Sequence, residues 1–218
     1  MTSTSSGADP RSVMLARIRD ALSGSSPADV EVPRDYRRHG DLPEDEVLAL
    51  FAERVDDYRA QVHRVGAEDL AGTLASVLAA AGARRVLVPD GLDRDWLATL
   101  EGQDVEVVAD DAELTSLHLD GFDAVITAAA VAVAETGTIV LDAGPDQGRR
   151  AITLVPDHHV CVVRAEQVVQ TVPEAIAGID PRRPLTWISG PSATSDIELD
   201  RVEGVHGPRV LDVIVVGS

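Results

Sequence analysis

Four short polar segments interrupt the apolar second half of this 218-residue chain. In chain order they are Glu135–Leu141, Pro156–Val160, Ile188–Glu198 and Gly204–Pro208. Each lies next to a strand-like apolar run, and α/β proteins place ligand-binding groups at such junctions because strand ends leave backbone groups free to meet a ligand. We therefore expect the functional site at these junctions.

The first segment places a carboxylate beside a glycine turn. Glu135 follows Ala128–Ala134, whose small side chains predict a short helix, and Gly137 turns the chain. The hydroxyls of Thr136 and Thr138 are suited to hold a carboxylate or a ligand. Glu135 is thus a candidate catalytic residue, and Thr136, Gly137 and Thr138 are candidate ligand-binding residues. The alternative is that Glu135 caps backbone N–H groups of the turn.

The third segment combines hydroxyls, carboxylates and a Gly-Pro turn directly after a strand-like run. Free N–H groups at a strand-to-helix turn, together with hydroxyls, form an anion site. The candidate ligand-binding residues here are Ser189, Gly190, Ser192, Thr194, Asp196 and Glu198. The alternative is ordinary helix capping by Ser192 or Asp196.

Histidines in the second and fourth segments are candidate acid/base groups near neutral pH. His206, flanked by glycines and Pro208, is the candidate catalytic histidine, whereas His159 is expected to be a hydrogen-bonded strand residue. No His-x-x-x-His or Glu-x-x-His spacing accompanies these histidines, so no metal site is predicted.

The charge balance excludes some classes of partner. Nineteen Lys and Arg against 37 Asp and Glu give a formal net charge of −18, which repels nucleic acids and anionic membrane surfaces. An anionic metabolite would need local cations, and the late candidates are Arg149, Arg150, Arg164 and Arg209.

Cysteine usage and hydropathy set further bounds. The single cysteine, Cys161, excludes a disulfide framework and an iron–sulfur cluster ligated by cysteines of this chain alone, and we expect it to be buried. No apolar segment approaches membrane-spanning length, and residues 1–9 lack the features of a secretion signal. We expect a cytoplasmic protein without a membrane span.

The elements that must position these residues divide the chain at residue 42. Residues 1–42 are expected to form a helix over 10–22 and a proline-containing tether, with a disordered start. Residues 43–218 are expected to form an α/β domain that begins with helices over 43–62 and 67–81. Strand-like runs then follow at 85–88, 96–100, 105–108, 124–127, 138–141, 152–155, 160–163, 185–189 and 213–216.

Strands that alternate with helical segments predict a three-layer α/β sandwich around a mixed, mostly parallel sheet. The runs between residues 138 and 163 are too closely spaced for crossover helices, so an antiparallel hairpin or meander is expected there.

Together, the four segments in this order and spacing resemble the LUD domain family, of the lactate utilisation C type, over roughly Pro43–Val216. The resemblance implies a fold related to NagB/RpiA/CoA-transferase-like proteins. It also implies a part in a multi-protein system that oxidises L-lactate to pyruvate, beside an iron–sulfur LUD-type protein and a cysteine-rich subunit. It identifies no cofactor for this chain. His158 stands where we expect a small or apolar residue between Asp157 and His159.

The leading hypothesis is a subunit of lactate oxidation without its own iron–sulfur cluster, which binds a small carboxylate or a partner's surface. One alternative is a stand-alone enzyme of CoA-transferase or sugar-phosphate-isomerase type, in which Glu135 does the chemistry. Another is a scaffold or regulatory protein that keeps the fold without catalysis.

Overall fold

A computed structural model describes residues 9–24, 32–100, 102–194, 202–203 and 207–217. The chain forms two compact units, residues 1–36 and 37–218. The first contains the helix α1 (Pro10–Leu22), which begins where the Asp9 side chain accepts hydrogen bonds from the backbone N–H groups of Arg11 and Ser12. No residue of α1 is buried. No helix among the described residues has the length and hydropathy needed to cross a membrane.

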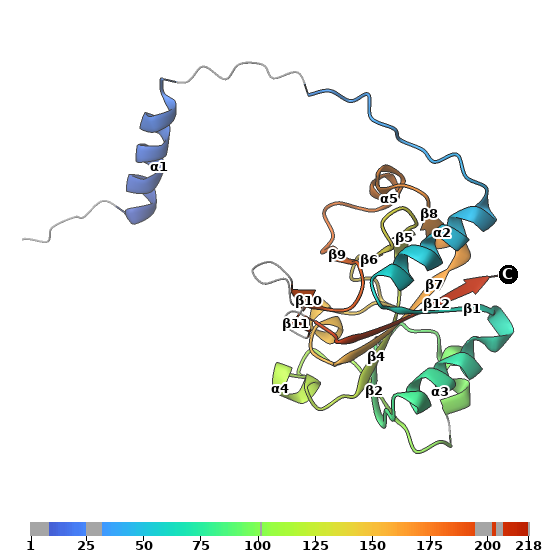
Figure 1. Ribbon diagram of the computed structural model, residues 1–218. Coiled ribbons are helices and arrows are strands. Elements are labelled where there is room, and N and C mark those ends of the chain that lie inside the picture. Colours follow the sequence, from blue (N-terminus) through green and yellow to red (C-terminus); the bar gives the residue numbers. More distant parts are fainter. Residues whose placement is uncertain (1–8, 25–31, 101, 195–201, 204–206, 218) are drawn as a thin grey trace, which may run out of the picture. The chain divides into compact units, whose positions relative to one another are not determined.

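The second unit is built on a sheet of six parallel strands in the order β1-β12-β7-β4-β2-β3 (Figure 1). The strands are β1 (Gln61–Gly66), β2 (Arg85–Val88), β3 (Glu106–Ala109), β4 (Ala124–Ala128), β7 (His158–Arg164) and β12 (Val210–Gly217). Every residue of β4 and all but the last of β7 are buried. Central parallel strands are covered on both faces, which explains their nearly continuous apolar runs.

A smaller sheet of four strands has the order β8-β5-β6-β9. Its strands are β5 (Val131–Val133), β6 (Thr138–Leu141), β8 (Val168–Val169) and β9 (Thr186–Ile188). β6 pairs antiparallel with both β5 and β9, whereas β5 pairs parallel with β8. The antiparallel hairpin expected among the runs between residues 138 and 163 was wrong: β6 pairs antiparallel with β5 and β9, which lie outside that stretch, and β7 belongs to the parallel central sheet. A short antiparallel pair, β10 (Ala193–Thr194) and β11 (Val202–Glu203), follows.

Helices and the small sheet cover the two faces of the central sheet. The helix α3 (Leu70–Ala80) and the 3₁₀ helix η2 (Arg94–Leu100) pack against one face. The helix α2 (Glu44–Asp57) and the small sheet pack against the other face. The remaining helical segments are η1 (Ala67–Asp69), α4 (Ser116–Leu119), η3 (Arg150–Thr153), η4 (Ala165–Gln167) and α5 (Val172–Gly178). The predicted three-layer α/β sandwich with a mostly parallel sheet is confirmed (Figure 1).

Several local predictions were wrong. The stretch Ala128–Ala134 is not a helix but contains β5, because Val131 and Val133 pack toward α5 while Ala132 and Ala134 pack toward α2. A strand buried on both faces has no polar alternation, so its pattern resembles that of a buried helix. The runs at 96–100 and 152–155, predicted as strands, lie in or beside the 3₁₀ helices η2 and η3.

The helix predicted over 43–62 ends early. α2 stops at Asp57, and Arg59 adopts a positive φ of 66° that turns the chain into β1. Val62 therefore belongs to a strand rather than to the apolar stripe of α2. The second helix, predicted to end at Gly82, matches α3, and Gly82 has a φ of 66°.

Two further glycines with positive φ allow the small-sheet layer to approach the carboxyl end of α2. Gly137 has a φ of 56°, and a Cβ atom there would lie 2.7 Å from the carbonyl carbon of Arg54. Gly190 has a φ of 80°, and its Cβ would lie 2.5 Å from the Cβ of Tyr58. Both turns therefore need glycine for its conformation and for its small size.

We predict that Gly137→Ala destabilises the protein by about 1–3 kcal/mol more than Gly82→Ala, because the added methyl group meets backbone atoms of α2. Gly82→Ala is the matched control: it carries the same positive-φ penalty, but nothing lies within 4 Å of the added atom. Urea denaturation followed by circular dichroism measures both free energies of unfolding. Equal losses of free energy of unfolding in the two variants would show that the contact between the added methyl group and α2 does not destabilise the protein.

Candidate functional site

Two cavities lie on opposite faces of the central sheet where β7 and β12 begin. Consecutive strand residues point to opposite faces, so His158 and Asp212 line one cavity while His159 and Leu211 line the other. The cavities are thus separated by the sheet and have different walls.

The cavity beside the small sheet, here called the Arg150 pocket, has a volume of about 270 Å³. Its lining includes the guanidinium-bearing Arg150, hydroxyl-bearing residues such as Ser189 and Ser192, and the apolar Leu154 and Leu211. Arg150 is exposed, and its guanidinium group makes no ion pair or hydrogen bond with a described residue. The pocket therefore combines one available cation with hydroxyls and an apolar wall.

The candidate residues at 136–138 and 189–192 come together beside this pocket. The hydroxyl of Thr138 hydrogen-bonds to those of Thr136, at 2.7 Å, and Ser189, at 2.8 Å. These bonds join the β5–β6 turn to the end of β9. Ser189, Gly190 and Ser192 line the Arg150 pocket, so Thr138 contacts a lining residue through Ser189, and Thr136 contacts Thr138.

Glu135 lies on the same turn but lines neither cavity. Its carboxylate pairs with the guanidinium of Arg37 and accepts a hydrogen bond from the Gln170 amide at 3.2 Å. Its backbone N–H donates to the carbonyl of Gln170 at 3.1 Å. In this arrangement Glu135 connects the turn to the segment before α2 and to Gln170, the residue after β8.

Asp196, Glu198 and His206 lie outside the described residues, and Thr194 is described only as backbone of β10. The described parts of the third and fourth polar segments contact each other: the backbone N–H of Ser192 donates to the carbonyl of Pro208 at 2.8 Å. This bond brings the third and fourth polar segments side by side.

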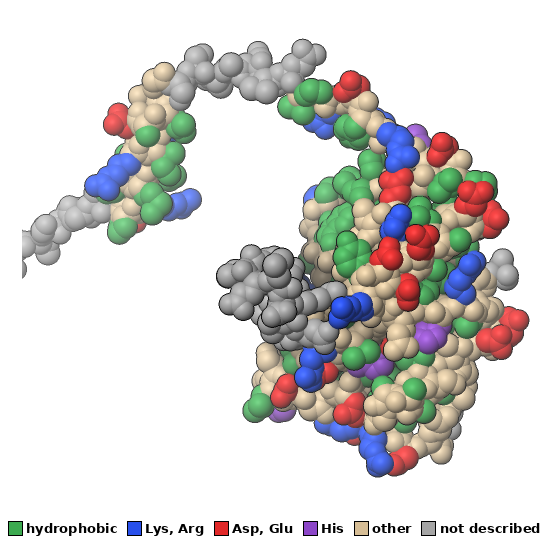
Figure 2. Space-filling model, viewed as in Figure 1, with side chains coloured by type: hydrophobic (Ala, Val, Ile, Leu, Met, Phe, Trp, Pro, Cys, Tyr) green, Lys and Arg blue, Asp and Glu red, His purple; other side chains and the backbone are tan. Residues whose placement is uncertain are grey.

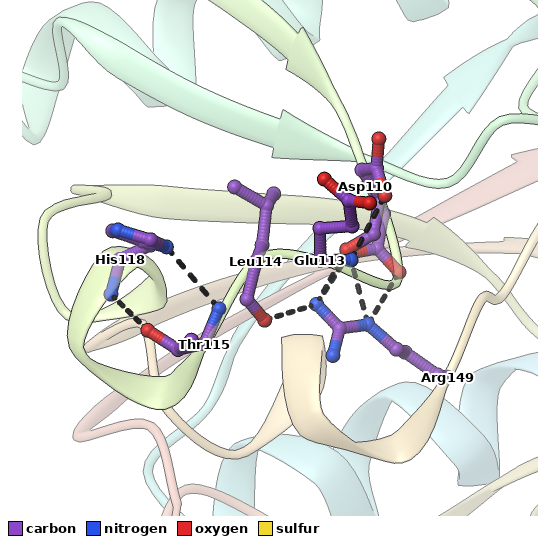
Figure 3. A network of polar contacts seen from close by, with 7 residues as sticks. Asp110, Glu113, Leu114, Thr115, His118 and Arg149 are labelled. Carbon is purple, nitrogen blue, oxygen red and sulfur yellow. Dashed lines mark hydrogen bonds and ion pairs between the residues drawn. The ribbon is translucent and has the colours of Figure 1, made fainter.

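Of the four predicted cations, three are engaged elsewhere. Figure 3 shows Arg149 in a bidentate ion pair with Asp110 and donating to the carbonyl of Leu114. Arg149 also donates to the carbonyl of Asp111. This network ties the chain after β3 to the start of η3. The Arg164 guanidinium stacks 5.4 Å from the ring centroid of Trp96, and Arg209 pairs with Asp157, which leaves Arg150 for a ligand.

The cavity on the α3 side, here called the α3 groove, is larger, at about 1290 Å³. Its floor holds an Asp between two His. The carboxylate of Asp212 contacts His63 Nε2 at 2.6 Å through one oxygen and His158 Nε2 at 2.8 Å through the other. Asp212 and His158 are buried, whereas 30% of the His63 side chain is exposed. Figure 2 shows histidine side chains at the surface between α2 and α3.

The two hydrogen bonds control the charge of Asp212. Burial alone would raise the pKa of this carboxyl, but the hydrogen bonds from His158 and His63 outweigh it and hold the pKa below its ordinary value. The carboxylate is therefore ionised at neutral pH, and it fixes the Nε2–H tautomer on both rings when they are neutral. The Nδ1 atom of His158 is buried and has no hydrogen-bond partner among the described residues.

His159, on the other face, is a hydrogen-bonded strand residue, as predicted, and it is fully buried. Its Nε2 atom hydrogen-bonds to the hydroxyl of Thr127 at 2.8 Å, and burial lowers its pKa to about 3, with the neighbouring His158 adding to the effect. His159 is therefore neutral at physiological pH. Cys161 is also buried, as predicted, and burial raises the pKa of its thiol to about 12.

The cluster of His63, Asp212 and His158 was missed from the sequence. His63 falls next to a run interpreted as helix, so its position on a strand could not be seen. Asp212 did carry a signal, since it is the one charged residue in the apolar run from Leu211 to Val216. A buried strand tolerates a carboxylate when partners satisfy it, and the unusual His158 in the second segment is one of those partners.

The layers and the two cavities define a three-layer α/β protein with its candidate sites at the amino ends of its central strands. Residues 48–216 match the model of the LUD domain, and the chain belongs to the LUD domain family.

Relatives and a solved structure agree with this assignment. The chain is 48% identical over 221 residues to lactate utilization protein C of Deinococcus radiodurans, with complete coverage of both chains. It is 27% identical to the protein of that name from Geobacillus thermodenitrificans, over 89% of this chain and 88% of the relative. The crystal structure of a DUF162 family protein from D. radiodurans superposes with a TM-score of 0.68 at 46% identity, covering 81% of this chain and all of that chain.

We predict that Asp212→Asn lowers the free energy of unfolding at pH 7 by about 1–3 kcal/mol, because it disrupts a buried pair of hydrogen bonds to a charged group. The pKa of Asp212 is lowered in the folded state, so its stabilisation is present above the unfolded pKa and is lost as pH falls through the folded value. The difference from wild type should therefore shrink below about pH 4.

The control is Asp104→Asn, which removes an ion pair with Arg84 in which the Asp104 side chain is 90% exposed. That change should cost less than about 1 kcal/mol at any pH. Denaturant titrations from pH 3 to 8 measure both variants. A loss for Asp212→Asn no larger than that for Asp104→Asn would contradict the prediction.

Proposed function

We propose that this chain is a subunit of an L-lactate utilisation system that oxidises lactate to pyruvate, and that it acts with iron–sulfur partner proteins. The observation that carries the proposal is the 48% identity over the full length to a lactate utilization protein C. Identity at this level over complete chains supports a shared fold and a shared role.

The Arg150 pocket supports a role in binding the hydroxy acid. Lactate has a carboxylate, a hydroxyl and a methyl group, and the pocket offers a guanidinium, the hydroxyls of Ser189 and Ser192, and the apolar Leu154 and Leu211. A bond between a guanidinium and a carboxylate is among the stronger polar contacts in proteins. The acidic chain needs such a local cation to hold an anion at all.

The cysteine supports a division of labour with partners. Cys161 is the sole cysteine of the chain, and it is buried with a thiol pKa of about 12. A cluster ligand must be a thiolate that reaches the iron. We therefore assign electron transfer to an iron–sulfur LUD-type protein and a cysteine-rich subunit.

We predict that Arg150→Gln weakens binding of L-lactate or pyruvate by about 10- to 100-fold, because a charge-assisted hydrogen bond contributes about 1.5–3 kcal/mol. Isothermal titration calorimetry or ligand-observed NMR measures the affinity. The control is Arg84→Gln, a surface arginine outside the pocket that also removes one positive charge. Equal weakening by both variants would assign the effect to net charge instead of to the pocket.

We also predict that the chain co-migrates with the two partner proteins in size-exclusion chromatography and increases lactate-dependent dye reduction by the mixture. A subunit that completes a lactate site should be required for turnover. If the chain neither co-migrates nor changes the rate, the proposed role in lactate oxidation is wrong. If it co-migrates and Arg150→Gln leaves the rate unchanged, the role stands but the carboxylate binds elsewhere.

A further inference from the structure

The Arg150 pocket takes its cation and part of its apolar wall from a very short element. Arg150 and Thr153 lie in η3 and Leu154 follows it, so all of these lining residues share one support. A 3₁₀ helix of four residues does not hold its own position, because short helices depend on tertiary contacts. The contacts that fix η3 therefore decide where the Arg150 guanidinium stands.

The body of η3 is fixed by burial and by one internal bond. The side chain of Ile152 is fully buried and packs with Leu87 and Val125 of the central strands. The hydroxyl of Thr153 donates to the carbonyl of Arg150 at 3.1 Å, which closes the turn. The start of the helix depends on a different contact, which comes from the residue before it.

Arg149 holds the start of η3 to the end of β3. Its Nε and Nη2 atoms each lie 2.9 Å from an oxygen of the Asp110 carboxylate, and Nη2 also donates to the Leu114 carbonyl at 2.8 Å (Figure 3). A further bond runs from Nη2 to the carbonyl of Asp111. The Asp110 side chain is only 10% exposed, and its backbone N–H donates to the Val88 carbonyl at 2.8 Å. The ion pair therefore connects η3 to a fixed point at the edge of the central sheet.

Arg149 and Arg150 are neighbours in the chain, but their side chains serve different places. Arg149 lines neither cavity, whereas Arg150 lines the pocket. Successive Cα atoms are about 3.8 Å apart, so a shift of Arg149 moves the base of the Arg150 side chain with it. Because binding groups must be held to within about 0.5 Å of their productive geometry, such a shift weakens a contact between Arg150 and a carboxylate.

We propose that the ion pair of Arg149 with Asp110 positions Arg150 and thereby sets the affinity of the pocket for a small carboxylate such as lactate or pyruvate. Arg149 and Asp110 are positioning residues: they do not touch the ligand, and they act through Arg150. This inference rests on the proposed function, because that proposal places the carboxylate of the hydroxy acid at Arg150.

The test uses variants of the full chain that conserve charge. Arg149→Lys keeps the positive charge, but an ammonium group lacks the planar fork that binds both oxygens of Asp110. The matched control is Arg85→Lys, because Arg85 pairs with Glu106 of the same strand β3, donates to the Gly121 carbonyl and lies outside the Arg150 pocket. Isothermal titration calorimetry or ligand-observed NMR measures the affinity for L-lactate, and circular dichroism checks that each variant is folded.

Arg149→Lys should weaken binding of L-lactate about tenfold, whereas Arg85→Lys should change it by less than about twofold. In a chain that already carries Arg150→Gln, the same Arg149→Lys change should alter the affinity by less than about twofold, because the residue that it positions is gone. Asp110→Glu, which keeps the charge but lengthens the side chain, should give the same pattern in both backgrounds.

Two outcomes overturn the positioning role while the proposed function stands. One is an affinity of the Arg149→Lys variant equal to that of the Arg85→Lys control. The other is an equal loss of affinity with and without Arg150→Gln, which would show that the ion pair acts on the fold in general and not through Arg150. Failure of the unchanged chain to bind L-lactate or pyruvate removes both this inference and the ligand-binding role of the pocket.

Discussion

The alternation of side chains along β7 and β12 is the constraint on which both candidate sites depend. These strands lie beside each other in the central sheet, and each successive residue points to the opposite face. His158 and Asp212 therefore face α3, while His159 and Leu211 face the small sheet. A slip of one residue in either strand would exchange a charged cluster for a core packing surface.

Buried polar groups on the two faces of the central sheet are satisfied in different ways. On the side of the small sheet, His159 is neutral, bonds to Thr127 and behaves as part of the core. On the α3 side, the ionised Asp212 is held by two histidines at the floor of an open groove. The first arrangement adds packing and one hydrogen bond, whereas the second keeps a buried charge that two hydrogen bonds satisfy, one of them from the partly exposed His63.

Loops beyond the central sheet shape the Arg150 pocket more than the strands do. The bonds of Thr138 to Thr136 and Ser189 join two strands of the small sheet, and Gly137 lets this layer approach α2. Arg149 anchors the start of η3 through Asp110. Because Arg149 is bound to Asp110, Arg150 is the cation that lines the pocket. The formal net charge of the chain is −18.

The sequence by itself determined the fold class, the burial of Cys161, the hydrogen-bonded strand position of His159, and the family. These follow from local apolar runs, from composition and from the order of four motifs. Each of these signals can be read from the sequence without knowledge of any tertiary contact. It also identified Ser189, Gly190 and Ser192, which line a pocket. Only the tertiary structure decided that β5 is a strand, because a segment buried on both faces has no period that separates it from a helix. Only the structure brought His63, 149 residues before Asp212, to that carboxylate, because the pairing of β1 with β12 is set by the whole sheet and not by either segment alone.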